Sequence, residues 1–366
     1  MSLKVGIVGL PNVGKSTLFN ALSNAGAEAA NFPFCTIDPN VGIVPVPDAR
    51  MDKLSEIVQP QKVTPAIIEF VDIAGLVKGA SEGKGKGNAF LSHIREVDLI
   101  AHVVRCFDDD NVIHVEGGVD PLRDIGIIEA ELIFKDLESL EKREAKLKAS
   151  AKSGDKKYLE QADIIAQLRA FMEDGKPARG FQTDEQTREI WADLFLLTEK
   201  TVLYVCNVDE HDLPDGANNP YVAKVRARAA EEGAEVEVVC AKIEAEIAEL
   251  DSDEKKLFLE ELGIASSGLD TMIASAYRQL GLITYFTAGV KEVRSWTIHK
   301  GMKAPQAAGV IHTDFERGFI RAETIKFEDY VNFGGEQGAK EAGKMRSEGR
   351  EYLVQDGDVM LFRFNV

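Results

Sequence analysis

The 366-residue chain has few cysteines and no long apolar run. Its four cysteines show no C-x-x-C spacing, so we expect neither a zinc site nor a disulfide framework. No run of about 18 apolar residues occurs, so the sequence predicts no membrane span. The start of the chain lacks the apolar core of a signal peptide, because Lys4 and a glycine-rich loop come at once. These absences lead us to expect a cytoplasmic protein with no membrane partner.

The chain is also short of positive charge. It has 43 lysines and arginines against 61 acidic residues, and its net charge of −18 argues against generic nucleic-acid binding, DNA included. The segment 283–366 is neutral, so the acidic excess lies in the first 282 residues. Within them, residues 142–157 reverse the sign, with seven basic residues and two acidic ones. This basic stretch is a candidate RNA contact, and a solvated helix end is an equally open alternative.

The clearest motif is Gly9–Thr17, which reads GLPNVGKST and fits the phosphate-loop pattern G-x-x-x-x-G-K-[ST]. An apolar strand candidate precedes it and a helix candidate follows, which is the setting that such a loop requires. Gly9 and Gly14 permit a loop whose backbone N–H groups face phosphate oxygens. Lys15 supplies a point charge for the β- and γ-phosphates, and the Ser16 hydroxyl is a Mg²⁺ ligand. An accidental glycine turn is disfavoured by the completeness of the match.

Two later positions fit the metal and the γ-phosphate. Thr36 lies 20 residues after Ser16 in a predicted loop, where a threonine can close over Mg²⁺. Asp72 ends an apolar strand three residues before Gly75, and a carboxylate there can hold Mg²⁺ through water. The alternatives are a loop threonine without a role and an aspartate that caps the next turn. Beside a phosphate loop, we favour the metal site.

The sequence lacks the glutamine that orients the attacking water in familiar GTPases, because Leu76 follows Gly75. Leucine cannot hydrogen-bond a water, so hydrolysis is slow or another group acts. His114 follows an acidic loop near a strand end and is our catalytic candidate, with a structural role as the alternative. His93 lies in a helical run and is less attractive.

The base-binding motif Asn-Lys-x-Asp is also absent. Asn207–Glu210 stands in its place, with Val208 for the lysine and Glu210 for the final aspartate. Glutamate is one methylene longer, so its carboxylate is misplaced for the two donors of guanine. We therefore predict that Asn207, Val208 and Glu210 form the base site and that adenine is permitted. Asn207 can either hold the loop or reach N7 of the base. Cys240–Lys242, after the next strand, is a weaker candidate for a second base loop.

The alternation of strands and helices predicts an α/β nucleotide-binding domain over residues 1–126 and 200–280. Its sheet is parallel, with helices on both faces. Between the two parts, residues 127–199 predict two long helices in an antiparallel hairpin with the basic stretch at its tip. A capping box at Thr183–Gln186 predicts a third helix. The hairpin is predicted from apolar spacing at Ile133, Leu137, Leu140 and Leu147, with Glu144 in the skipped slot, and at Ile165, Leu168 and Met172. Residues 283–366 predict a small α+β domain.

Taken together, the motifs resemble those of the YchF, or Obg-like ATPase, family of GTPase-fold proteins. The resemblance extends over the whole chain and rests on four stretches, Gly9–Thr17, Asn31–Thr36, Asp72–Ser81 and Asn207–Glu210. It implies ATP preference over GTP, a leucine in place of the catalytic glutamine, and binding to the ribosome or its large subunit. It also implies that residues 283–366 form a TGS domain of β-grasp fold.

The resemblance carries over to particular residues of the phosphate loop. It implies nucleotide contacts from Asn12, Val13, Gly14, Lys15, Ser16 and Thr17. It implies Mg²⁺ ligands at Ser16 and Thr36, beside the water-mediated contact of Asp72. Asn12 matches an asparagine that places K⁺ in some relatives, and its role here stays open.

Two main hypotheses follow, and they are compatible. In the first, the chain is a switch that hydrolyses ATP. The alternative is a GTPase, and the relative affinity for ATP and GTP distinguishes the two. In the second, it is a nucleotide-regulated ribosome-binding module with negligible turnover, with rRNA contacted by the basic hairpin tip or the TGS domain. We expect a monomer. A small-molecule kinase is disfavoured because no lid arginine cluster is seen, and Cys35 is a redox handle only if it is exposed with a lowered pKa.

Overall fold

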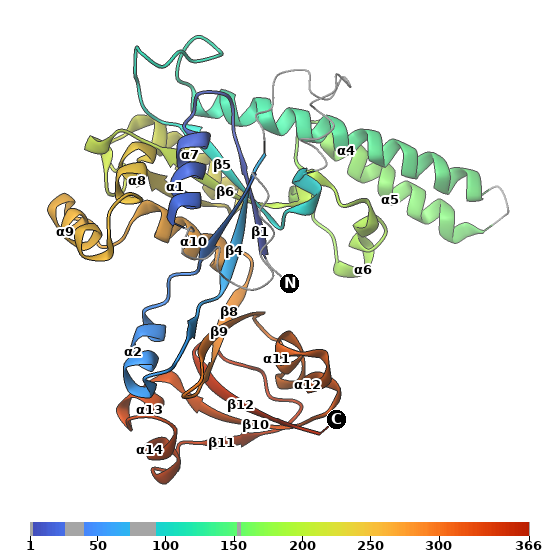
Figure 1. The fold of residues 1–366 in the computed structure, drawn as a ribbon. Coiled ribbons are helices and arrows are strands. Elements are labelled where there is room, and N and C mark those ends of the chain that lie inside the picture. Colours follow the sequence, from blue (N-terminus) through green and yellow to red (C-terminus); the bar gives the residue numbers. More distant parts are fainter. Residues whose placement is uncertain (1–2, 26–39, 74–92, 152–154, 366) are drawn as a thin grey trace. The chain divides into compact units, whose positions relative to one another are not determined.

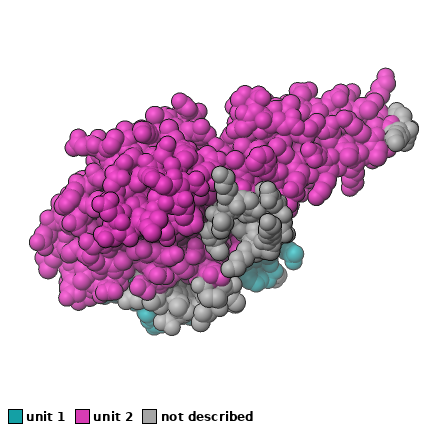
Figure 2. All heavy atoms as spheres, turned by 90° about the horizontal axis from the view of Figure 1, so that it is seen from above, with its two compact units in different colours: residues 1–2, 44–68, 273–366 teal, residues 3–43, 69–272 magenta. Residues whose placement is uncertain are grey.

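The computed structural model describes residues 3–25, 40–73, 93–151 and 155–365 (Figure 1). Its contacts divide the chain into two compact units (Figure 2). The larger comprises residues 3–43 and 69–272, and the smaller comprises residues 1–2, 44–68 and 273–366. The segment 44–68 therefore groups with the C-terminal part, whereas the sequence placed it in the nucleotide-binding domain. The domain boundaries predicted from the sequence remain a prediction.

The first sheet has six strands in the order β2-β4-β1-β5-β6-β7. The pairs β1–β5, β5–β6 and β6–β7 are parallel, as predicted. All seven residues of β5 are buried, which is why its sequence is a continuous apolar run rather than an alternating one. The strands are β1 (Leu3–Val8), β2 (Val41–Pro45), β4 (Ile67–Asp72), β5 (Leu99–Arg105), β6 (Thr201–Asn207) and β7 (Glu235–Val239).

Helices lie on both faces of this sheet, as the sequence predicted. Helix α1 packs against α8, and α4 packs against α7. Their ends carry ordinary signals: in α7 the Asn219 side chain accepts from two backbone N–H groups, Pro220 opens the helix, and Gly233 ends it at φ 69°. Including the helical insertion, the helices described between Lys15 and Gln279, apart from α2 (Ala49–Val58), are α1 (Lys15–Ala25), α4 (Pro121–Ala151), α5 (Lys156–Glu173), α6 (Glu185–Arg188), α7 (Pro220–Glu232), α8 (Ala241–Ile247), α9 (Ser252–Leu262) and α10 (Gly268–Gln279). Helix α10 spans the boundary between the two units.

The predicted helical hairpin is confirmed by α4 and α5, which lie side by side (Figure 1). Glu144, which interrupts the apolar spacing of α4, is buried. Its carboxylate accepts from Arg169 Nε at 2.9 Å and from Lys148 Nζ at 2.5 Å. The apolar core of the hairpin consists of Ile133, Leu140, Leu147, Ala162, Ile165, Leu168, Met172, Ala178, Trp191 and Leu196.

The predicted third helix is wrong beyond its first turn. Helix α6 has only four residues and is capped by Asp184, one position after the expected start. The chain then bends inward so that Trp191 joins the hairpin core, and Phe195 adopts a left-handed conformation at φ 49°. Tertiary burial of the indole therefore outweighs the helical signal.

A fully buried carboxylate joins α4 to the end of this segment. Asp136 Oδ1 accepts from Leu197 N at 2.8 Å, and its Oδ2 accepts from Thr198 N at 2.8 Å and Thr198 Oγ1 at 2.7 Å. Burial nevertheless raises the pKa of Asp136 to about 6, with the Thr198 and Leu197 hydrogen bonds opposing the shift. These contacts fix the 3₁₀ turn Leu197–Glu199, which leads into β6.

Replacing Asp136 should destabilise the larger unit. We expect Asp136→Ala to lower the free energy of unfolding by about 3 kcal/mol at pH 7, because three donors lose their buried acceptor. Urea denaturation followed by far-UV circular dichroism measures this. The matched control is Glu138→Ala on the same helix, which removes an exposed carboxylate and should change stability by less than about 0.5 kcal/mol.

The pH dependence of that difference gives a second readout. The native pKa of Asp136 lies above its unfolded value, so the native state binds the extra proton between these two values, and wild-type stability falls as pH rises toward about 6. Asp136→Ala should lack this contribution. Equal losses in Asp136→Ala and Glu138→Ala would contradict the assignment.

The smaller unit contains the second six-stranded sheet, in the order β11-β10-β12-β8-β9-β3. Strands β8 and β9 form an antiparallel hairpin, and β12 runs parallel to β8. The sequence predicts strands at Ile283–Phe286, Arg294–Ile298 and Val359–Phe364, and β8, β9 and β12 confirm them, whereas β10 and β11 were missed. The strands are β3 (Val63–Thr64), β8 (Leu282–Ala288), β9 (Val293–His299), β10 (Phe319–Lys326), β11 (Arg346–Glu348) and β12 (Asp358–Phe364).

Five helices accompany this sheet and build two apolar cores. One core joins Tyr285 to the alanines of α11, and the other joins Phe286 to α2 and α13. The α+β texture is therefore as predicted, while the assignment to a TGS domain stays a prediction. The helices are α2 (Ala49–Val58), α11 (Ala304–Ile311), α12 (Thr313–Arg317), α13 (Phe327–Asn332) and α14 (Glu336–Glu341).

Candidate functional site

The phosphate loop connects β1 to α1 and depends on its two glycines. Gly14 has φ 98°, and a Cβ there would lie 2.2 Å from Asn207 Nδ2. Gly9 leaves no room either, since a Cβ would lie 2.5 Å from the Val103 carbonyl oxygen. The chain then enters α1 at Lys15, so the positive end of that helix opens beside the loop. The structure thus gives the motif the anion-binding form that its sequence predicts.

Lys15 and Asp72 are electrostatic neighbours in this site. The Lys15 side chain is buried, and its Nζ donates to the Leu10 carbonyl at 2.9 Å. Burial lowers the pKa of Lys15 while Asp72 opposes the shift, and burial raises the pKa of Asp72 while Lys15 opposes it. Ser16 is exposed one residue further along α1. An exposed hydroxyl and a nearby carboxylate are a donor set that fits Mg²⁺.

Asn207 joins the phosphate loop to the predicted base loops. Its Nδ2 donates to the Val13 carbonyl at 2.9 Å, and its Oδ1 accepts from the Ala241 backbone N–H at 2.9 Å. The side chain is buried, so both bonds are shielded from water. The amide therefore holds three loops together, which is one of the two roles predicted for it, and its contact with the base stays a prediction.

A cavity of about 320 Å³ adjoins the phosphate loop at this point. Val208 is buried in its wall, and Glu210 is half-exposed with its carboxylate 3.8 Å from Lys242 Nζ. The predicted Cys240–Lys242 loop also lines it. Sequence reasoning missed the opposite wall, which Phe107, Asp109 and Val112 supply. The available signal was their position directly after β5, since such loops meet at the carboxyl edge of a parallel sheet.

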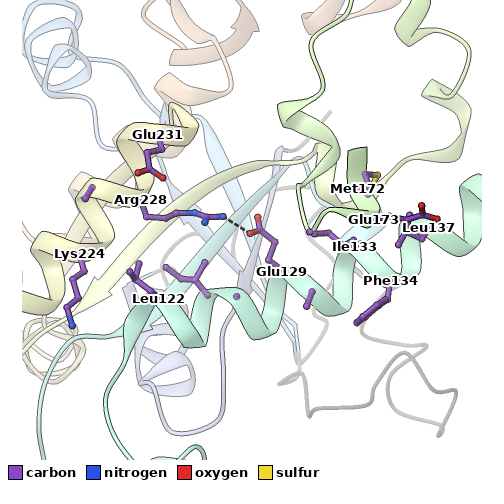
Figure 3. Close-up of a pocket in the computed structure, with 15 residues that line it drawn as sticks. Leu122, Glu129, Ile133, Phe134, Leu137, Met172, Glu173, Lys224, Arg228 and Glu231 are labelled. Carbon is purple, nitrogen blue, oxygen red and sulfur yellow. Dashed lines mark hydrogen bonds and ion pairs between the residues drawn. The ribbon is translucent and has the colours of Figure 1, made fainter. Parts of the chain in front are cut away.

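A larger cavity of about 640 Å³ lies apart from the phosphate loop, among α4, α5 and α7 (Figure 3). Its lining is mainly apolar, and Arg228 Nη2 donates across it to Glu129 at 2.8 Å. No phosphate-loop residue lines it. We therefore take the smaller cavity as the candidate base site, because phosphate-loop residues Asn12, Gly14 and Thr17 contribute to it.

His114 has the contacts of a structural histidine, the alternative that the sequence left open. Its Nε2 lies 2.8 Å from Asp124 Oδ2, and its Nδ1 accepts from the Glu116 backbone N–H at 3.1 Å. Because Nδ1 is an acceptor, the proton is assigned to Nε2 and is directed at the carboxylate. Both ring nitrogens are thus engaged and the side chain is buried, so this geometry does not support the predicted catalytic role.

Several predicted positions lie outside the described residues. These are Thr36 with the neighbouring Cys35, and Gly75 with Leu76. Among the residues that are described, no group of three or more histidine, cysteine, aspartate or glutamate side chains could hold a metal ion. No helix in the described part of the chain is long and apolar enough to cross a membrane.

Comparison with known proteins places this geometry in a family. One family model, described as a 50S ribosome-binding GTPase, matches residues 4–129. A second, YchF-GTPase_C, described as a protein of unknown function, matches residues 282–365. A Bacillus subtilis protein named ribosome-binding ATPase YchF is 60% identical over 366 residues, which cover 100% of both chains. This chain belongs to the YchF family. The family resemblance inferred from the sequence is confirmed.

Other YchF relatives agree. An Escherichia coli O157:H7 protein with the same name is 55% identical over 367 residues, again with 100% of both chains covered. The solved structure of the Schizosaccharomyces pombe YchF GTPase has a TM-score of 0.88 at 41% identity and covers 99% of this chain and 98% of its own. A GTP-binding protein from Pyrococcus horikoshii OT3, at 18% identity and a TM-score of 0.61, shows the fold alone.

The role of Asn207 can be tested by removing its amide. We expect Asn207→Ala to weaken binding of a fluorescent nucleoside triphosphate by about tenfold or more, because the phosphate loop loses a buried tether. Fluorescence titration measures the dissociation constant. Asn332→Ala, which removes an exposed asparagine from α13, is the control and should bind like wild type. Wild-type affinity in Asn207→Ala would show that the tether is dispensable.

Proposed function

We propose that this chain is a Mg²⁺-dependent ATPase of the GTPase fold that associates with the ribosome in the cytoplasm and acts as a monomer. The observation that carries the proposal is full-length identity of 60% to a protein named ribosome-binding ATPase YchF. It is supported by a phosphate loop with both required glycine conformations and a buried Lys15. Lys15 and the backbone N–H groups of residues 12–17 grip the triphosphate.

The base loop supports adenine over guanine. Guanine recognition needs a short carboxylate that accepts from two ring-edge donors, and Glu210 is longer and lies near Lys242. Val208 places an apolar side chain in the wall where the guanine motif has a lysine. The family model over residues 4–129 and the Schizosaccharomyces pombe structure are both described as GTPases. GTP is therefore the competing substrate that a binding experiment must include.

The metal assignment rests on Ser16, Thr36 and Asp72, with Asp72 acting through water. When bound, Mg²⁺ neutralises charge on the β- and γ-phosphates and orients them. Lys15 adds its own positive charge to the same oxygens. Asn12 is assigned to a K⁺ site as a second proposal; its Nδ2 already donates to the Ile113 carbonyl at 3.1 Å, which leaves its Oδ1 for a cation.

Turnover is expected to be slow without a partner. Leu76 cannot orient a water, and the ring nitrogens of His114 are committed to Asp124 and Glu116. Either the ribosome supplies or positions the missing group, or nucleotide binding alone regulates docking. The second case is the binding-module hypothesis, and Leu76 is the observation that favours it.

The basic hairpin tip is our proposed rRNA contact, with the C-terminal unit as the alternative surface. Exposed lysines at 142, 146 and 148 end α4, and Lys156 and Lys157 begin α5. Lys148 forms an ion pair with Glu144. Among the described residues the other four form no ion pair, so their charges are available to bind a phosphate. A basic tip on an acidic chain limits electrostatic attraction for RNA to one end of the hairpin.

Paired titrations with ATP and GTP test the nucleotide assignment. With Mg²⁺ present, we expect ATP to bind at least about tenfold more tightly than GTP, because the guanine fork is misplaced. Lys15→Ala should abolish measurable binding of both by removing the buried charge. Lys4→Ala, which removes an exposed lysine outside the loop, is the matched control. A clear preference for GTP would overturn the base assignment.

Charge reversal tests the hairpin. Changing Lys146, Lys148, Lys152 and Lys156 together to glutamate should weaken cosedimentation with ribosomes and flatten its salt dependence, since each lost phosphate contact reduces the logarithmic slope by about 0.7–0.9. Reversing Lys300, Lys303, Lys340 and Lys344 in the C-terminal unit is the comparison. Unchanged binding in the hairpin variant would rule the tip out. A loss confined to the C-terminal variant would assign docking to that unit.

A further inference from the structure

Arg105 is a buried arginine that the nucleotide-binding motifs do not include. It ends β5 and is 2% exposed. Its guanidinium donates to three backbone carbonyls of the following loop: Nε to Phe107 at 3.1 Å, Nη1 to Val112 at 2.8 Å and Nη2 to Asp109 at 3.2 Å. The same group lies over the Phe107 ring, 4.6 Å from its centroid.

A buried guanidinium usually has a carboxylate partner. Across the described ranges, Arg105 forms no ion pair, and its hydrogen bonds go to backbone carbonyls of one loop. Buried polar groups are costly unless paired, so this arrangement organises the loop from within. Three carbonyls spread over six residues can be reached together because the guanidinium presents its donors in a rigid fork.

The organised loop is one wall of the candidate base cavity. Phe107, Asp109 and Val112 all line the cavity, and their carbonyls are the three that Arg105 binds. Two further contacts fasten the loop: Asp109 Oδ1 accepts from Asn111 N at 2.8 Å, and Asn12 donates to the Ile113 carbonyl. The loop therefore connects to the phosphate loop at one end and to Arg105 along its length.

We propose that Arg105 is a positioning residue that allows the cavity to bind a purine base by fixing this wall. The inference rests on the proposed nucleotide function and deepens it. It separates two tasks: residues 9–17 grip the triphosphate, and Arg105 holds Phe107 and Val112 where a purine ring would lie against them. A purine gains stacking and apolar contact only if that wall is in place before it arrives.

Two substitutions remove the fork in different ways. Arg105→Lys keeps a positive charge but concentrates its donors at one point, so it cannot reach three carbonyls. Arg105→Met keeps the unbranched length and leaves the carbonyls without a donor. The matched control is Arg179→Lys, a partly buried arginine in the same unit that pairs with Glu129 and Glu232 away from the base cavity.

The experiment compares three probes with Mg²⁺ present: ATP, GTP and inorganic tripolyphosphate, which has no base. Isothermal titration calorimetry gives the dissociation constants, and circular dichroism confirms folding. In both Arg105 variants we expect ATP affinity to fall by about tenfold or more, GTP affinity to fall with it, and tripolyphosphate affinity to stay within about twofold of wild type. Arg179→Lys should keep the wild-type ratio of ATP to tripolyphosphate affinity whatever it does to stability.

The outcomes separate the two proposals. If wild type binds neither ATP nor tripolyphosphate, the proposed function fails, and this inference fails with it. If wild type binds ATP and the Arg105 variants keep its ATP-to-tripolyphosphate ratio, only the positioning role is overturned. An equal loss for all three probes also overturns it, because that is the signature of general damage to the fold. If Arg105→Met does not fold, the ratio in Arg105→Lys decides.

Discussion

The candidate site depends on one buried amide. Asn207 ends β6 and bonds both the Val13 carbonyl in the phosphate loop and the Ala241 backbone N–H at the start of α8. Gly14 must lack a side chain because that amide occupies the space. A single residue therefore holds the phosphate loop against two loops that follow neighbouring strands. This explains how Val208 and Glu210 can depart from the guanine pattern while the first residue of the motif is kept.

The parts that the sequence predicted are those in which spacing has a local physical cause. The phosphate loop needs glycine where the backbone is left-handed or crowded, and a hairpin needs apolar residues on one face of each helix. The wall at Phe107 has no such pattern. Its conformation comes from the hydrogen bonds of Arg105, and a sequence gives no sign that an arginine at a strand end turns back on its own loop. The sequence could not decide between the catalytic and the structural role of His114 for a similar reason, because its partner Asp124 belongs to the next helix.

The buried acidic residues of the helical insertion show the same limit of prediction from sequence. The spacing of apolar residues identified Glu144 as an acidic residue at a position where an apolar one is expected. In the structure its carboxylate forms an ion pair with Arg169. Nothing in the spacing revealed Asp136, whose partners lie 61 and 62 residues later. An acidic residue on an amphipathic helix is usually solvated, so only tertiary contacts identify this one as a cap for a distant turn. Glu144 links the two helices of the hairpin, and Asp136 links α4 to the turn that leads into β6.

The electrostatics of Lys15 explain why the conformation of the phosphate loop matters for binding an anion. Burial lowers the pKa of Lys15, and Asp72 only partly offsets that effect. The charged form of the lysine is therefore held in an environment short of negative charge, and a triphosphate supplies what is missing. Such a site gains more from an anion than an exposed lysine would, provided that the loop does not relax to let water reach the ammonium group. The Asn207 amide holds the phosphate loop in the conformation in which Lys15 is buried, so the amide and the buried charge contribute to the same anion site.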